Sequence, residues 1–243
     1  MTYSPDARGQ PPVNKQLSIH TSNCKFFAES GRNDDCVCEP LDRVTSVKYL
    51  GIIVDNNLKW NSHINYLVSR LRNLIFQFYR INKIKHLYVI RLIYNAYAKS
   101  FFQYCIEVWG GAMNAHINKL FVIQKHIIRA ALGRPRLYPS KLIFDELRAL
   151  TIRQLYIRNL IIYLNHNKKL FITRNLSYRI RPLGNSICIP AFNKRICRHQ
   201  TYYICCKLLN IIPIDFVYSK LRISNLNNIT FWVKEHFYFK MVH

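Results

Sequence analysis

Residues 46–55 limit the possible folds more than any other stretch, because the sequence pattern changes abruptly just after them. β-Branched and aromatic side chains lie on both sides of Gly51, which predicts two short strands joined near the glycine. From Asn61 onward, apolar side chains recur every three or four positions, the period of an amphipathic helix. These apolar positions are Ile64, Leu67, Val68, Leu71, Leu74, Ile75 and Phe78. The chain is therefore expected to pass from a small β element directly into a long helix.

Four more helices are predicted in the middle of the chain. Helical periodicity covers residues 87–105 and 114–132, and Gly133 followed by a proline ends the second of these. Residues 140–149 and 151–167 fit two further helices. Aromatic side chains of the 87–105 segment, including Tyr94, Tyr97 and Tyr104, are expected on one face of the helix.

The two ends of the chain have weaker patterns. Residues 17–20 and 24–26 are candidate short strands, while residues 168–200 are basic and typical of a loop. A short apolar segment over 202–212 is followed by a possible last helix over 226–240. The predicted fold class is mainly α with a small N-terminal antiparallel β element (α+β).

Three regions are expected from these patterns. Residues 1–60 would hold the β element, residues 61–167 a helical bundle, and residues 168–243 a basic extension with a short terminal helix.

The charge of the chain indicates its class of partner. It has 36 Lys and Arg residues against 12 Asp and Glu, and the first 42 residues account for four of the basic and six of the acidic ones. The other 201 residues therefore carry a net charge of +26, whose self-repulsion a polyanion would relieve. Nucleic acid is favoured over an anionic membrane surface, because 14 Phe and 16 Tyr suited to base stacking are interleaved with the charge.

An intracellular location is expected, with nucleus and cytoplasm not distinguished. No run of 18 apolar residues is present, and the N-terminus lacks the basic start and apolar run of a signal peptide. The eight cysteines are therefore expected to be reduced, and no membrane partner is predicted. Four Cys and His residues spaced C-x8-C-x-H-x5-C, from Cys188 to Cys205, match no metal-ligand pattern.

No catalytic site is predicted in this chain, and no cofactor or metal. Two-metal polymerase chemistry needs paired carboxylates on a tight turn between apolar strands. The adjacent acidic pair Asp34-Asp35 lies in a polar, loop-like setting. The other pair, Asp145-Glu146, lies in a helical pattern, where neighbouring side chains diverge.

Two strings resemble one family of enzymes. Residues 44–64 (VTSVKYLGIIVDNNLKWNSHI) and residues 104–110 (YCIEVWG) are similar to the segment after the active site in reverse transcriptases of LINE-type (non-LTR, jockey-like) retrotransposons. Residues 92–95 and 120–125 extend the resemblance, and residues 206–213 (CKLLNIIP) resemble its closing signature, with a leucine where tryptophan is more usual.

The resemblance implies the end of the palm, a primer-grip hairpin and a helical thumb. Lys48, Tyr49, Leu50 and Gly51 would be the grip. The exposed cations of the helices would contact nucleic acid, namely Arg70, Arg72, Lys119, Lys125 and Arg129. The implied partners are an RNA–DNA or DNA duplex, bound without sequence preference, and the missing upstream polymerase region. That region would carry the catalytic aspartates and their Mg²⁺ before Met1, so this chain would bind a primer–template without extending it.

Less specific interpretations remain for the same residues. The chain could be a non-catalytic basic module derived from a retroelement, which binds nucleic acid or a protein, and a stand-alone enzyme is a third interpretation. Gly51 could be only a bulge in a small sheet. Tyr104 and Trp109 are expected in the core, since aromatic residues at a helix end usually are, and the cations could form a solvated face.

Overall fold

The computed structural model describes residues 17–18, 40–41, 44–84, 86–167, 189–191, 197, 199–211 and 226–236. The chain forms two units, Met1–Val47 and Lys48–His243. In the first, strand β1 (Leu17–Ser18) pairs antiparallel with β2 (Pro40–Leu41), with Leu17 opposite Leu41. The predicted strand over residues 24–26 lies outside the described residues.

A β-hairpin forms where the sequence predicts two strands around Gly51. Strand β3 (Ser46–Tyr49) pairs with β4 (Ile52–Asp55). The two residues between them, Leu50 and Gly51, have φ of 45° and 83°. Two consecutive left-handed residues between paired strands indicate a type I′ turn, so Gly51 lies in the turn and not in a bulge.

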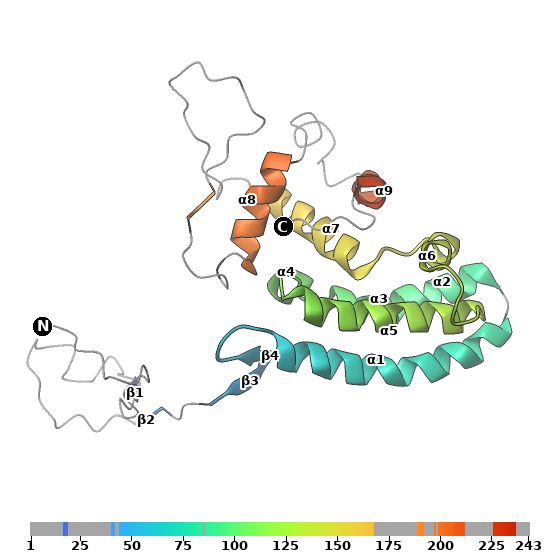
Figure 1. Cartoon of the computed structure of the whole chain (residues 1–243), viewed down its shortest axis with the longest axis horizontal. Helices are drawn as coiled ribbons and strands as arrows, with labels where there is room; N and C mark the ends of the chain where they lie inside the picture. Colours follow the sequence, from blue (N-terminus) through green and yellow to red (C-terminus); the bar gives the residue numbers. More distant parts are fainter. Residues whose placement is uncertain are drawn as a thin grey trace, which may run out of the picture. The chain divides into compact units, whose positions relative to one another are not determined.

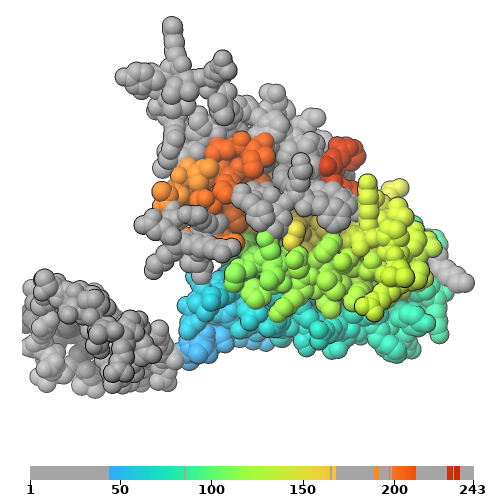
Figure 2. Space-filling model, viewed as in Figure 1, coloured from blue at the N-terminus to red at the C-terminus, as the bar shows by residue number. Residues whose placement is uncertain are grey.

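Helix α1 (Asn61–Ile81) begins at the predicted residue, helix α5 (Asn114–Leu132) matches its predicted range, and the two lie side by side (Figure 1). They run in the same direction, because Asn65 contacts Lys119 near their starts, while Asn82 lies against Gly133 beyond their ends. Their buried side chains belong to one hydrophobic core. In the space-filling view the two helices form a continuous surface (Figure 2).

The predicted helix over 87–105 is wrong as a single element. It is divided into α2 (Leu87–Ala96) and α3 (Ala98–Gln103), and a short α4 (Ile106–Trp109) follows. Cys105 has a left-handed φ of 48°, which turns the chain between α3 and α4. Phe102, Ile106 and Trp109 thereby enter the core, whereas Tyr97 and Tyr104 remain more than half exposed. The expected burial is correct for Trp109 and wrong for Tyr104.

The remaining helices contribute side chains to the same hydrophobic core. They are α6 (Ser140–Leu147), α7 (Ile152–His166), α8 (Thr201–Ile211) and α9 (Leu226–His236), with a 3-10 turn η2 (Asn82–Ile84) after α1. Helix α7 packs against α4, α8 and α9 and begins with a capping box between Thr151 and Gln154. Residues 237–240 of the predicted last helix, and most of the predicted loop, lie outside the described residues.

A buried glutamine joins three of these helices. Gln124 of α5 donates from Nε2 to Tyr94 Oη at 2.9 Å and to the carbonyl of Leu150 at 2.8 Å. Its Oε1 accepts from the backbone N–H of Ile152 at 3.0 Å. These bonds connect α5 to α2 and to the start of α7, so they fix the core that supports the hairpin.

The fold class predicted from sequence, mainly α with a small antiparallel β element, is confirmed. No helix in the described part of the chain is both long enough and apolar enough to cross a membrane.

Candidate nucleic-acid interface

The two strings that carry the family resemblance contact each other in the fold. Tyr104 Oη donates a hydrogen bond of 2.7 Å to the carbonyl of Leu50, at the tip of the hairpin. Tyr104 is held in turn by Trp109, whose Nε1 donates to the Tyr104 carbonyl at 2.9 Å. Because Trp109 is completely buried, this chain of contacts ties the exposed turn to the core.

Gly110, which ends the second string, and the next residue, Gly111, permit close packing. A Cβ atom on Gly110 would lie 2.3 Å from Cδ2 of Tyr156 in α7, and one on Gly111 would lie 2.2 Å from the carbonyl oxygen of His199. The ring of His199 donates from Nδ1 to the Gly111 carbonyl at 2.9 Å. The tryptophan-glycine part of the string therefore has a structural role, which is to seat α4 against α7 and the segment before α8.

At the base of the hairpin, two titratable groups are buried. The Ile53 backbone N–H donates to Nδ1 of His63 at 3.4 Å, and the His63 ring lies edge-on to Trp109. Burial lowers the pKa of His63, and the carboxylate of Asp55 opposes that shift. Among the residues that the structure describes, none forms a hydrogen bond with His63 Nε2 or Asp55 Oδ1, and both atoms are buried.

Helix termini give a physical account of the buried carboxylate. The carboxylate of Asp55 raises the pKa of both His63 and His116, against the lowering effect of burial. These histidines are the third residues of α1 and α5. Neither helix has an acidic residue in its first turn or a side-chain cap. Asp55 therefore lies near the starts of two parallel helices, where unpaired backbone N–H groups give a partial positive charge.

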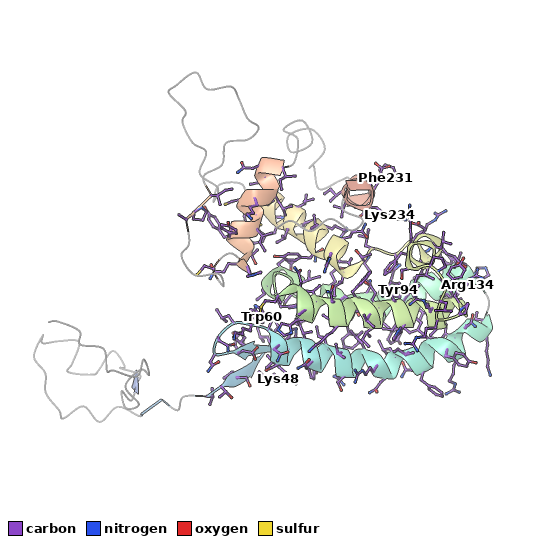
Figure 3. The ribbon with its side chains drawn as sticks, viewed as in Figure 1. Lys48, Trp60, Tyr94, Arg134, Phe231 and Lys234 are labelled. Carbon is purple, nitrogen blue, oxygen red and sulfur yellow. The ribbon has the colours of Figure 1, made fainter. Side chains whose placement is uncertain are left out.

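The predicted grip residues lie at an exposed, cationic end of the molecule. Tyr49 is 67% exposed and Leu50 is 71% exposed. Lys48 Nζ lies 5.4 Å from the ring centre of Tyr66, and the Arg70 guanidinium lies 5.7 Å from the same ring. Figure 3 shows Lys48 at the hairpin end of the helices and Arg134 at the opposite end. We call Lys48, Arg70 and Tyr66 the hairpin cluster.

Arg72 of α1 and Lys119 of α5 lie away from the hairpin cluster, on the face of α1 that carries Asn65. Lys119 Nζ donates to Asn65 Oδ1 at 3.3 Å. Arg72 follows Asn65 by seven residues, about two helical turns, and so shares its face. Both cations are exposed, as predicted.

Lys125 and Arg129 are less exposed than predicted. The ammonium of Lys125 lies 4.7 Å from the ring centre of Phe121, and burial together with Arg129 lowers its pKa. Arg129 is half-buried and donates from Nη2 to the Tyr138 carbonyl at 3.0 Å and to Ser140 Oγ at 3.2 Å. The expectation that Arg129 is a fully exposed cation is wrong, because its guanidinium fastens α5 to the start of α6.

Tyr66 and the hydroxyl of Tyr104 are candidate site residues that the sequence did not reveal. Tyr104 belongs to the resembling string, but its contact with Leu50 joins positions 54 apart. Tyr66 gives no signal, since its place beside Lys48 depends on how the hairpin meets α1.

The two acidic residues of α6 each form an ion pair. Asp145 Oδ1 pairs with Lys234 Nζ at 2.9 Å, and Glu146 Oε1 pairs with Arg134 Nη2 at 2.7 Å. Across the residues that the structure describes, no three Cys, His, Asp or Glu side chains are grouped to hold a metal ion. Both carboxylates of α6 are thus engaged by cations, and Asp34-Asp35 lies outside the described residues.

Comparison with known proteins gives two curated relatives. The chain is 31% identical over 144 residues to the RNA-directed DNA polymerase from mobile element jockey of Drosophila funebris, a match covering 54% of this chain and 15% of the relative. It is 25% identical over 97 residues to the probable RNA-directed DNA polymerase from transposon X-element of Drosophila melanogaster, covering 39% of this chain and 11% of the relative.

No family model matches the chain, and no solved structure does. The two matches nevertheless confirm the resemblance that the two strings indicated, since both relatives are polymerases of LINE-type elements. The chain is thus similar to part of the RNA-directed DNA polymerases of two LINE-type retrotransposons.

Proposed function

We propose that this chain provides part of the primer–template-binding surface of a retrotransposon reverse transcriptase. In this proposal the β3–β4 hairpin is the primer grip and the helical bundle is the thumb, and the ligand is an RNA–DNA or DNA duplex bound without sequence preference. The observation that carries the proposal is the Tyr104–Leu50 hydrogen bond, which fixes an exposed turn beside two cations.

The distribution of charge supports a polyanionic ligand. Residues 44–167 contain 18 Lys and Arg residues against four acidic ones, and neither α1 nor α5 contains an acidic residue. Of the four, Asp55 is buried, while Asp145 and Glu146 are paired with cations. The outer surface of these helices thus has little negative charge to repel phosphates.

Binding without nucleotide addition is the activity that we propose for the isolated chain. The paired carboxylates of α6 support this, because both are engaged by cations. In a primer-extension reaction with Mg²⁺ and all four deoxynucleotides, we expect no product. Product formation would favour the stand-alone enzyme.

The test is a salt titration of hybrid binding with matched variants. Fluorescence anisotropy of a labelled RNA–DNA hybrid should show the affinity of the full chain falling steeply between about 50 and 200 mM salt, because phosphate-bound counterions are released. Replacing Lys48 and Arg70 together by alanine should reduce the slope of log affinity against log salt by about 2, roughly 1 for each lost phosphate contact.

The matched control removes two exposed cations from the other end of the helices, Arg80 and Arg136. We expect it to change the slope less than the Lys48 and Arg70 double variant does. A flat salt dependence would contradict the proposal. Equal effects of the two double variants would contradict the assignment of the hairpin as the grip, and an acidic protein that competes as well as the hybrid would favour the interaction module.

A further inference from the structure

We infer that a groove beside the hairpin accommodates one unpaired nucleotide, with its base between the turn and α3 and its phosphate at the hairpin cluster. The inference rests on the proposed function and names the part of the nucleic acid that this end of the molecule would recognise.

The groove has a volume of about 370 Å³. The hairpin turn forms one wall through Leu50 and Gly51, and Tyr66 of α1 lies on another. Phe101 and Tyr104, at the end of α3, complete the site. This volume lies at the lower end of the range for small-ligand sites, about 300–1,000 Å³, and therefore suits one planar base better than a longer segment.

The chemistry of the walls favours a base without reading its identity. Three aromatic rings line the groove, and every nucleobase has a π-face that can stack on such rings. Among the polar groups on the walls, Ser100 Oγ already donates to the Tyr97 carbonyl at 2.7 Å and Tyr104 Oη to the Leu50 carbonyl, whereas His63 Nε2 has no hydrogen-bond partner among the described residues. Stacking on the rings of Tyr66, Phe101 and Tyr104 is the contact that every base could make.

The cations at the rim match a phosphate. Lys48 and Arg70 both lie within 6 Å of the Tyr66 ring centre, so they flank a residue that lines the groove. No acidic side chain is among the described groove-lining residues. A nucleotide combines the apolar π-face and the anion that this arrangement needs, whereas an apolar peptide would leave the two cations unmatched.

Pairing state decides which nucleotide can enter. A base inside a duplex is paired with the opposite strand and stacked on both of its faces, and its extrusion costs a few kcal/mol. An unpaired terminal base has no base pair and fewer stacking contacts to give up, so its entry into the groove costs less free energy. The groove should therefore select the end of a duplex that carries one unpaired nucleotide.

The experiment compares three hybrids with the full chain: a blunt hybrid, a hybrid with one unpaired nucleotide at its 3′ or 5′ end, and the same hybrid with an abasic residue there. We expect the unpaired base to tighten binding about five- to tenfold over both other ligands, the lower part of the range for one base–aromatic stack. An unpaired 2-aminopurine should also lose fluorescence on binding, because it becomes stacked. Equal affinities for the three hybrids would overturn the inference.

Two tryptophan variants locate the effect. Ser100 is exposed and lines the groove, so Ser100→Trp should fill it. Asn95→Trp is the matched control, at an exposed position of α2 that does not line the groove. Ser100→Trp should abolish the preference for the unpaired base, whereas Asn95→Trp should preserve it.

These outcomes separate the inference from the proposed function. Salt-dependent blunt-hybrid binding with no preference for an unpaired base would overturn the groove alone, and absence of any hybrid binding would overturn both. A preference retained in Ser100→Trp would also overturn the groove. If Ser100→Trp does not fold, judged by circular dichroism, the abasic comparison with the unmodified chain still decides.

Discussion

Leu50 combines an unfavourable left-handed backbone conformation with an exposed side chain. A leucine at φ 45° costs about 1 kcal/mol relative to a right-handed conformation, and type I′ turns favour asparagine or glycine there. With 71% of the side chain exposed, little burial offsets this cost. Backbone strain of this kind is concentrated at functional positions, which motivates a functional interpretation of the exposed leucine.

Replacing Leu50 by asparagine should separate stability from binding. Leu50→Asn produces the Asn-Gly pair that type I′ turns prefer, so we expect the free energy of unfolding to rise by about 1 kcal/mol. Hybrid affinity should fall, because the exposed apolar side chain is lost at the proposed grip. Urea denaturation and anisotropy measure the two effects. A rise in both quantities would show that Leu50 contributes nothing to binding.

Gly51→Ala is the comparison at the neighbouring turn position. Its φ of 83° disfavours any side chain, although a Cβ there would meet Tyr104 Cε1 at an ordinary 3.7 Å. The variant should therefore lower stability through backbone strain and not through a clash.

Arg129 links α5 to the start of α6 through hydrogen bonds. Arg129 was expected from the helical pattern to be exposed, but it donates to the Tyr138 carbonyl and to Ser140 Oγ. Arg72, with the same side chain on α1, is exposed. Two cations that look alike in sequence should therefore respond differently to substitution.

Lysine substitutions test this difference while the charge is kept. Arg129→Lys should lower the free energy of unfolding by about 1 kcal/mol, because the ammonium cannot reproduce the planar donor geometry of the guanidinium. Arg72→Lys should change it by less than about 0.5 kcal/mol, as is usual for surface positions. Chemical denaturation of the two variants provides the measurement. Equal small effects would mean that Arg129 does not hold α6.

The strongly periodic elements were predictable, and those set by distant contacts were not. Helices α1 and α5 follow from apolar residues at a 3.6-residue period and from Gly133, and the hairpin follows from Gly51 between apolar strands. The division between α2 and α3 at Tyr97 has no glycine or proline to announce it, so the periodicity predicted one continuous helix. The turn at Cys105 that follows depends on tertiary contacts, since Trp109 reaches the core while Tyr104 reaches the hairpin.

The same distinction holds for the candidate interface. Lys48, Arg70, Arg72 and Lys119 could be predicted as exposed because each lies opposite an apolar face or on the hairpin. The grouping of Lys48 with Arg70 around Tyr66 could not, because it depends on where the hairpin meets α1. The binding roles of all these residues remain predictions.

Three histidines make the stability of the folded chain sensitive to acid. Burial lowers the pKa values of His63, His116 and His126, and neighbouring cations lower those of His116 and His126 further. The unfolded chain, with histidine pKa values near 6.5, therefore binds more protons than the folded chain at mildly acidic pH. The contribution of the neutral histidines to stability is fully present above about pH 6.5. It is lost as the pH falls through the lowered pKa values of the folded state.

Thermal unfolding at constant ionic strength should show this loss. We expect the midpoint to be nearly constant above about pH 7 and to fall steadily below about pH 6.5. His63→Gln, which cannot titrate, should flatten the dependence even though it weakens packing on Trp109. A midpoint that rises on acidification would contradict the pKa directions. An unchanged slope in His63→Gln would assign the effect to the other histidines.

The parallel arrangement of α1 and α5 has a consequence for how the chain is made. Two helices that follow each other directly can fold as a hairpin, but parallel neighbours need a connection that returns to the starting end, here residues 82–113 (Figure 1). During synthesis, α1 therefore leaves the ribosome long before the helix that covers its apolar face. Until Leu132 has emerged, that face is a target for chaperones, and the hairpin at its start has no Tyr104 anchored by a folded core.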